Sequence, residues 1–281
     1  MFAQGGIGES ANYLARFLTL AWLSLAQLVR VPSHSRRADA ARRAARHILL
    51  LAVIVGLAIV ALMYALDAWE IGQMPPRGAA SLWWARFLTD FGKDVYVLGS
   101  LGMLLIAVAI VAPALRGIQR SLLLGLGTRL QFLFFAVLVP VLIGEGIKWI
   151  VGRGRPFVGG DASVFHFSHF AGTQAYSSFP SSHSTTAFAL ALAVSAVWPR
   201  ARMAMVAYAI IIAATRLVLL AHHPSDVVAG ALLGIIGAMF VRYWFAARRL
   251  GFAIHHDGTI VPLVGPSPGR LKRVARGALA P

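Results

Sequence analysis

The sequence predicts an all-α membrane protein, a polytopic helix bundle with six transmembrane helices and an N-terminal interfacial helix. Its 281 residues are 58% hydrophobic and 13% charged, whereas a soluble domain carries about 25% charged residues. The mean hydropathy is +0.73. A net charge of +16 suggests nucleic acid in a soluble protein, but most of this chain is too apolar to be exposed to water. We therefore expect the bilayer, and no nucleic acid, as a partner.

The six predicted spans are stretches of roughly 20 mostly apolar residues, the length needed to cross the hydrocarbon core. They are Ile48–Leu66, Val95–Leu115, Leu130–Ile147, Pro180–Trp198, Met203–Ala221 and Pro224–Phe245. An earlier uncharged stretch, Phe17–Val29, has 13 residues; it is short for a crossing and predicts an interfacial helix, with a seventh span as the alternative. No basic n-region or small-residue cleavage site accompanies it, so we expect no removable signal peptide.

Charge and composition divide the chain into residues 1–47, a basic cytoplasmic segment with the interfacial helix, residues 48–245, the six-span domain, and residues 246–281, a mobile basic cytoplasmic tail. The two ends and the alternate loops carry 19 of the 26 Lys and Arg residues. The positive-inside rule makes that side cytoplasmic, with both termini inside. There is no Cys, which excludes disulfides and thiolate metal sites.

Three polar clusters are predicted at the opposite, outer face, where ionisable groups at span ends indicate function by default. They are KWIVGRGRP from Lys148 to Pro156, PSSH from Pro180 to His183, and RLVLLAHHPSD from Arg216 to Asp226. Taken singly, a basic residue at a helix end often snorkels to the interface and a Ser-Ser-His often caps a helix. Their convergence favours a site instead.

The basic residues of these clusters predict a phosphate site. Lys148, Arg155 and Arg216 are cations without a neighbouring acidic cluster, and guanidinium groups match phosphate oxygens. Ser181 and Ser182 add hydroxyls and backbone N–H groups at a helix N-terminus, which is a favourable place for an anion. A sulfate or carboxylate would satisfy the same donors, so charge alone does not name the ligand.

Two histidines predict catalysis at that phosphate. Phosphoryl transfer needs a nucleophile and a general acid in line, and His222 and His183 can supply them. Asp226, four residues after His222, is placed to orient its ring as the third member of a triad. His223 is the rival nucleophile, but its spacing to Asp226 fits less well.

The clusters resemble the phosphatidic acid phosphatase type 2 and haloperoxidase superfamily, whose pattern is K-x6-RP, PSGH and SR-x5-H-x3-D. Order and spacing match throughout, and the six-span frame extends the resemblance to roughly residues 48–245. The departures are Ser182 in place of Gly and Thr215 in place of Ser. A Cβ at Ser182 can crowd the phosphate or favour a different headgroup. The peroxidases of the superfamily are soluble, so the spans favour its lipid phosphatase branch.

The resemblance implies a role for each matching residue. Lys148, Arg155, Ser181, Ser182 and Arg216 would bind phosphate. His222 would form a phosphohistidine, His183 would protonate the leaving oxygen and then activate water, and Asp226 would orient His222. It also implies no cofactor and no metal.

The expected function is hydrolysis of a lipid phosphomonoester or pyrophosphate in the outer leaflet of a bacterial inner membrane. By resemblance to the family's bacterial members, plausible substrates are polyprenyl pyrophosphate, phosphatidylglycerol phosphate, phosphatidate and lipid A. A phosphotransferase that uses the same phosphohistidine is one alternative. A non-catalytic anion-binding or transport protein is another, because buried cations also mark transport pathways. The sequence does not give the oligomeric state.

Three further features receive structural interpretations. Arg153 is expected to face lipid headgroups, with a phosphate role as the alternative, and Glu145 to pair with Lys148 three residues later. The loop Phe157–Phe179, which includes Asp161, is long enough for a substrate lid, and its aromatic residues suit the membrane interface. The external segment Asp67–Asp94 is expected to contain a short amphipathic helix around Trp83–Leu88 and no chemistry.

Overall fold

The computed structural model of this chain describes residues 5–75, 78–158 and 164–263, with side chains from residue 12 onward. The helices are α1 (Gly5–Val29), α2 (Arg37–Ala65), α3 (Asp67–Gln73), α4 (Trp83–Asp90), α5 (Asp94–Val111), α6 (Gly117–Val151), α7 (Ser182–Val197), α8 (Arg202–Val218) and α9 (Pro224–Ala247). Short 3-10 turns lie at Ala80–Leu82, Gln174–Tyr176 and Pro199–Ala201. The predicted helical class is confirmed, with one small addition in the tail.

Five segments within the described residues are long and apolar enough to cross a membrane. They are Arg37–Ala65, Ala80–Val111, Gly117–Val151, Pro199–Val218 and Pro224–Ala247. The second joins α4 to α5 and therefore takes in the predicted amphipathic helix. The remaining predicted span, Pro180–Trp198, corresponds to α7, whose 16 residues measure about 24 Å, less than the roughly 30 Å hydrocarbon core. Most of its residues are buried between α6, α8 and α9, so its length need not match the lipid.

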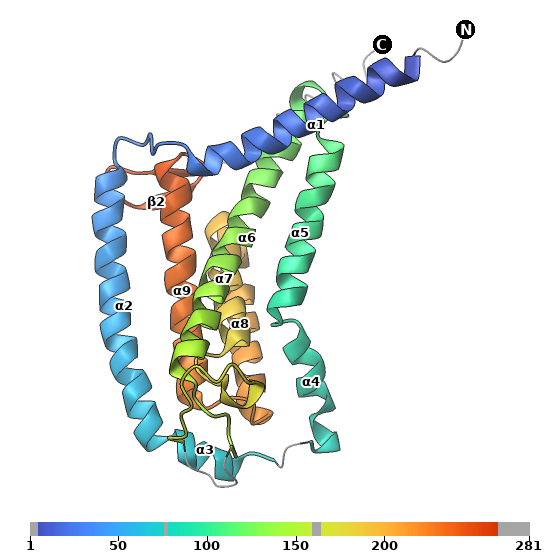
Figure 1. Ribbon diagram of the computed structural model, residues 1–281. Coiled ribbons are helices and arrows are strands. Elements are labelled where there is room, and N and C mark those ends of the chain that lie inside the picture. The colour runs from blue at the N-terminus through green and yellow to red at the C-terminus, as the bar shows by residue number, and fades with distance from the viewer. Residues whose placement is uncertain (1–4, 76–77, 159–163, 264–281) are drawn as a thin grey trace.

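The helix α1 is longer than the stretch that predicted it, since it starts at Gly5 and contains Arg16. It is not one of the five candidate spans. In Figure 1, α1 lies obliquely across one end of the bundle, while α3 lies at the other end. The large apolar side chains of α1, including Leu18 and Trp22, are mostly exposed.

Small residues bring α9 against α6 and α7. A Cβ at Gly230 would lie 2.4 Å from the Ser181 carbonyl oxygen, and one at Gly234 would lie equally close to that of Thr185. On the other side, a Cβ at Gly237 would lie 2.6 Å from Pro140 Cβ of α6. Such close backbone approach is typical of helix packing in membranes. It fixes the start of α7 beside the start of α9.

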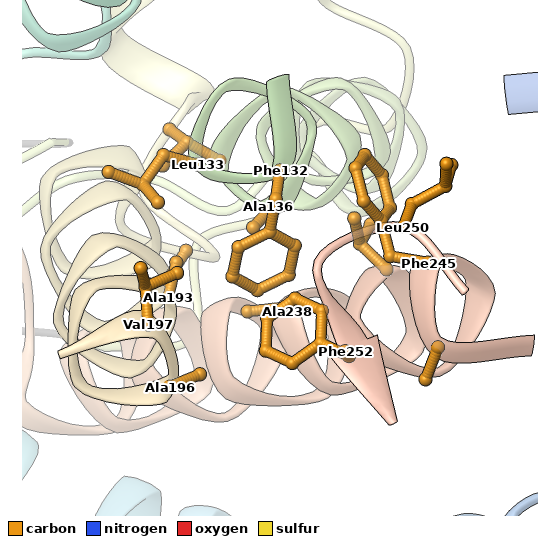
Figure 2. Packing of buried hydrophobic residues seen from close by; sticks show 14 of the residues in the cluster. Phe132, Leu133, Ala136, Ala193, Ala196, Val197, Ala238, Phe245, Leu250 and Phe252 are labelled. Atoms are coloured by element: carbon orange, nitrogen blue, oxygen red, sulfur yellow. The ribbon is translucent and has the colours of Figure 1, made fainter. Parts of the chain in front are cut away.

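The tail begins with a β-hairpin that the sequence analysis did not foresee. Strands β1 (Phe252–Ile254) and β2 (Ile260–Pro262) pair antiparallel. Phe252 is buried and packs edge-on against Phe132 of α6, with ring centroids 4.8 Å apart; Figure 2 shows it beside Ala238 of α9. The description of residues 246–281 as a mobile tail is therefore wrong for this part. Residues 264–281, with the remaining basic residues of the tail, lie outside the described part.

Candidate active site

The three polar clusters meet at the end of the bundle that carries α3. The last turn of α6, the first turn of α7 and the connection from α8 to α9 all lie there (Figure 1), opposite α1 and the hairpin. Residues far apart in the sequence are therefore brought to one end.

Lys148, in the last turn of α6, contacts both the first turn of α7 and its own helix. Its Nζ lies 2.6 Å from Glu145 Oε1 and also donates to the Ser182 hydroxyl. The Ser182 hydroxyl in turn lies 2.9 Å from the Glu145 carboxylate. The predicted pair of Glu145 and Lys148 is present, and Ser182, the departure from the family pattern, joins it. The ammonium group is thereby held at the start of α7.

Gly152 ends α6 and turns the chain back over the site. Its φ of 57° is left-handed, and a Cβ there would lie 1.8 Å from the Ser168 carbonyl oxygen, so only glycine fits. After this turn, Arg155 N donates to the Ala175 carbonyl at 2.9 Å, and the Arg155 guanidinium lies 3.4 Å from Gln174 Oε1. The loop thus determines the position of Arg155.

The start of α7 is anchored by its backbone. Ser181, the residue before the helix, is fully buried and its N–H donates to the Asp226 carbonyl at 3.0 Å. Its hydroxyl makes no capping bond to the helix. Ser181 therefore occupies the N-cap position of α7 without the side-chain hydrogen bond that usually goes with it. A methyl group at Gly92, before α5, would lie 3.5 Å from the His183 ring, which places that ring between α7 and the break between α4 and α5.

Arg216, in the last turn of α8, is 7% exposed. Its Nη1 donates to the Thr89 hydroxyl of α4 at 2.6 Å. Nothing in the residue pattern around Thr89 indicated this contact, because it depends on how α4 packs against α8. The bond directs the guanidinium toward the end of the bundle that carries the other clusters.

Several buried polar atoms of this region have no hydrogen-bond partner within residues that the structure describes. They include the Ser181 hydroxyl, His183 Nε2 and Arg216 Nε, as well as both ring nitrogens of His223. Buried polar groups are nearly always satisfied, so each such group asks for an explanation. Ser181 and Arg216 are two of the residues expected to bind phosphate, and His183 is the expected proton donor.

His222 lies between α8 and α9 and is 2% exposed. Its Nδ1 lies 2.8 Å from the Ser178 carbonyl oxygen, so that Nδ1 carries the proton and Nε2 has the lone pair. Burial, followed by the charges of Arg216 and Arg155, lowers the pKa of His222 well below its usual value. The ring is therefore neutral, as a nucleophile requires.

Within the described residues, the hydrogen bonds of the Asp226 carboxylate go to other groups than the His222 ring, in contrast to the direct orientation expected from the sequence. Its Oδ2 accepts from the Ser178 hydroxyl at 2.6 Å and from the His223 backbone N–H at 2.9 Å. The first turn of α9 directs the carboxylate toward the chain before α7 instead of toward His222. Ser178 thus links the two residues, because its hydroxyl donates to Asp226 and its carbonyl accepts from the His222 ring.

Arg153 is buried, 1% exposed, and does not face lipid headgroups as expected. Its guanidinium lies 2.7 Å from Asp226 and 2.8 Å from Asp67 of α3. It also donates to the Ser225 hydroxyl at 2.6 Å and the Val164 carbonyl at 3.1 Å. A guanidinium shared by two buried carboxylates has its charge compensated, and here it joins α3 to the start of α9.

The acids of α3 are the main omission of the sequence analysis. Asp67 accepts from the Ser225 N–H at 3.0 Å and is fully buried. Glu70 is 4% exposed, and burial, together with the charges of Asp67 and Asp226, raises its pKa to about 7. The available signal was the position of two acids directly after an uncharged span, in a chain with only 10 acids.

The loop between the first two clusters presents exposed aromatic rings. Phe165, Phe167 and Phe170 are 40–56% exposed. Phe170 packs edge-on against Trp149 of α6 with centroids 4.7 Å apart, and Phe165 lies 5.3 Å from Tyr64 of α2. Asp161 lies outside the described residues. The rings lie on the outer surface of the loop, as an interfacial anchor requires.

Comparison with known proteins relates part of this chain to a family. Residues 129–250 match the PAP2 superfamily. A lipid A 1-phosphatase of Rhizobium johnstonii is 39% identical over 127 residues, which are 45% of this chain and 52% of that protein. A lipid A 1-phosphatase of Rhizobium etli is 38% identical over 127 residues, covering 45% and 55%.

A more distant relative is the bacitracin transport permease protein BcrC of Bacillus licheniformis, 25% identical over 170 residues that cover 58% of this chain and 79% of the relative. The chain spans about half the length of the two lipid A 1-phosphatases. No solved structure matches it. The segment that matches the PAP2 superfamily contains all three clusters, and it lies in a chain with five helical segments long and apolar enough to cross a membrane.

Proposed function

We propose that this protein is a lipid phosphatase that removes a phosphate from a membrane lipid through a phosphohistidine. The observation that carries the proposal is the meeting of a buried, neutral, oriented imidazole, His222, with the cations Lys148, Arg155 and Arg216 at one end of the bundle. Cations that offset the charge of the equatorial oxygens and a positioned nucleophile are what phosphoryl transfer needs.

The phosphate-binding role goes to five residues of the three clusters. They are Lys148, Arg155, Ser181, Ser182 and Arg216. The buried, unpartnered Ser181 hydroxyl and Arg216 Nε support this assignment, because a bound phosphate would satisfy them. The first N–H groups of α7 add donors and the positive end of a helix dipole.

In the first step His222 Nε2 attacks phosphorus, the N–P bond forms and the ester P–O bond breaks. His183 gives its proton to the leaving oxygen. In the second step water attacks the phosphohistidine, His183 takes a proton from it, and the N–P bond breaks to release inorganic phosphate. Asp226 is a positioning residue in this scheme, since it acts through Ser178.

The proposed substrate is a lipid phosphomonoester, with the 1-phosphate of lipid A tested first, because two relatives bear that activity in their names. Polyprenyl pyrophosphate, phosphatidylglycerol phosphate and phosphatidate follow. The aromatic loop 164–179 is proposed as the membrane-facing lid.

The proposed topology counts α7 as a sixth, internal span. Both termini are then cytoplasmic, and the site faces the periplasm of a bacterial inner membrane. Residues 1–47, 48–245 and 246–281 keep their proposed division, with the hairpin packed onto the six-span domain.

The test is phosphate release by the detergent-purified protein from these lipids, with and without EDTA. We expect release that EDTA does not reduce, and a loss of about 10³-fold or more in His222→Ala. His47→Ala, which removes an exposed histidine at the far end of α2, should retain activity. Release from no lipid, but transfer to a lipid or sugar hydroxyl, would replace the hydrolase by a phosphotransferase; binding without turnover would replace it by a carrier.

A further inference from the structure

A basic pocket lies at the other end of the bundle, beneath the C-terminal part of α1. It has a volume of about 450 Å³ and is lined by Gln27, Arg30, Thr128, Arg129 and Arg249, among others. No Asp or Glu lines it. Within the described part of the chain none of the three arginines forms an ion pair. Within those residues no carboxylate offsets their positive charge.

The guanidinium contacts that do exist go to backbone carbonyls. Arg30 donates to the Arg248 carbonyl, and Arg129 donates to the Leu263 carbonyl at 3.4 Å. Such contacts orient the guanidinium groups without neutralising them. A ligand with a negative charge and several acceptor oxygens fits this pocket best.

An apolar groove adjoins the pocket. It has a volume of about 460 Å³ between α1, α5 and α6, with Leu20, Ala109 and Phe135 among its lining, and it shares Gln27 and Thr128 with the basic pocket. A second apolar groove of about 440 Å³ lies between α1, α6 and α9 and shares Phe135 with the first. The basic pocket is thus followed by two adjoining apolar grooves.

We propose that this composite site binds one anionic diacyl phospholipid of the leaflet opposite the catalytic site. Its headgroup phosphate contacts Arg30, Arg129 and Arg249, and its two acyl chains occupy the grooves under α1. Basic pockets between membrane helices that meet apolar surface are how anionic headgroups are held. The last 18 residues of the chain are the rival occupant, but they contain four basic and no acidic residues, so their charge opposes that of the pocket.

The site would tie α1 to the bundle. In the described residues the polar contacts of α1 with the bundle are few, such as Gln27 with Gln131 at 3.0 Å and Tyr13 with the Ile110 carbonyl at 2.6 Å. A lipid between α1, α5, α6 and α9 would fill the space that protein side chains leave there. The inference concerns the far end of the bundle and does not depend on the proposed chemistry.

The test is lipid binding by the full-length, detergent-purified protein, measured by native mass spectrometry. The probes are dioleoyl phosphatidylglycerol, dioleoyl phosphatidylcholine and glycerol 3-phosphate. We expect one tightly held phosphatidylglycerol, with phosphatidylcholine and glycerol 3-phosphate much weaker. Equal binding of phosphatidylcholine, or of glycerol 3-phosphate, would overturn the proposal, because the first removes the need for charge and the second the need for chains.

Variants locate the site. Arg129→Gln and Arg249→Gln should each weaken phosphatidylglycerol binding about fivefold, whereas Arg129→Lys should retain most of it. Ala109→Phe, which fills the groove, should also weaken it. The matched controls Arg200→Gln and Arg202→Gln remove exposed charges at the same end and should have no effect.

Arg216→Gln distinguishes lipid bound in the proposed catalytic site from lipid bound under α1. This variant should leave phosphatidylglycerol binding unchanged, even if the phosphatase proposal fails. Binding that is lost in Arg216→Gln but kept in Arg129→Gln and Arg249→Gln would place the lipid in the catalytic site and refute the second site. If the pocket and control variants all bind as the wild type does, the site under α1 does not exist.

Discussion

The Nδ1 atom of His222 lies 2.8 Å from the carbonyl oxygen of Ser178, a residue 44 positions earlier in the chain. The hydroxyl of the same serine donates to Asp226 at 2.6 Å. Ser178 is fully buried. The orientation of the proposed nucleophile therefore depends on a residue outside the three clusters, and Asp226 holds that residue in place.

Ser178→Ala tests this arrangement. The variant keeps the carbonyl but loses the bond to Asp226, so the ring loses part of its support. A lost hydrogen bond to a charged group costs about 1.5–3 kcal/mol, so we expect kcat to fall by about tenfold or more with little change in KM. Ser177→Ala, which removes the neighbouring hydroxyl bonded to the Thr173 carbonyl, is the control. A change in KM alone would speak against a positioning role.

Arg153→Met tests the buried network. It leaves the carboxylates of Asp67 and Asp226 without their shared cation, and removal of one partner of a buried ion pair costs about 3–5 kcal/mol. We expect a strong fall in the thermal unfolding midpoint in detergent. Arg86→Met removes an exposed arginine of α4 and should leave the midpoint nearly unchanged. Equal midpoints for both variants would show that the network does not stabilise the fold.

Gly152→Ala tests the turn that ends α6. The left-handed backbone alone costs about 1–2 kcal/mol for a residue with a Cβ, and the contact with the Ser168 carbonyl adds to it. Two controls separate these causes. Gly172 has a φ of 63° but no close neighbour, so Gly172→Ala should be destabilised by the backbone cost alone. Gly146 lies in the α6 interior with nothing within 4 Å of an added Cβ, so Gly146→Ala should be as stable as the wild type or more stable. The unfolding midpoint should be highest for Gly146→Ala, lower for Gly172→Ala and lowest for Gly152→Ala.

The apolar stretches and the polar clusters could be predicted from the sequence because both depend on local composition. Ile48–Leu66 is a span whichever helix lies beside it, and Lys148 comes three residues after Glu145 on any helix. The helix boundaries do not follow from apolar composition alone. α2 begins at Arg37, because arginines are good helix formers and extend the helix beyond its apolar part.

The contacts of Arg153, Asp67 and Thr89 could not be predicted, because each depends on the packing of helices distant in sequence. The hairpin is a different case. Asp257-Gly258 lies between two short alternating stretches, which is a strong hairpin signal, and the Asp257 side chain bonds the Thr259 N–H at 3.0 Å. The basic, glycine-rich composition of the tail concealed a local pattern that was there to be found.

Glu70→Gln tests the buried acid of α3 through the pH dependence of stability. The pKa of Glu70 is raised to about 7 from an ordinary 4.5, so between these values the folded protein holds a proton that the unfolded chain releases. The contribution of protonated Glu70 to the free energy of unfolding is fully present below about pH 4.5 and is lost as the pH rises toward 7. Glutamine resembles the protonated acid and avoids this loss.

We expect Glu70→Gln to stabilise the protein by about 1–3 kcal/mol at pH 8 and to have little effect at pH 4.5, measured as unfolding midpoints. The control Glu145→Gln, at a half-exposed acid, should not show this gain at pH 8. A Glu70→Gln effect that is the same at both pH values would contradict the raised pKa.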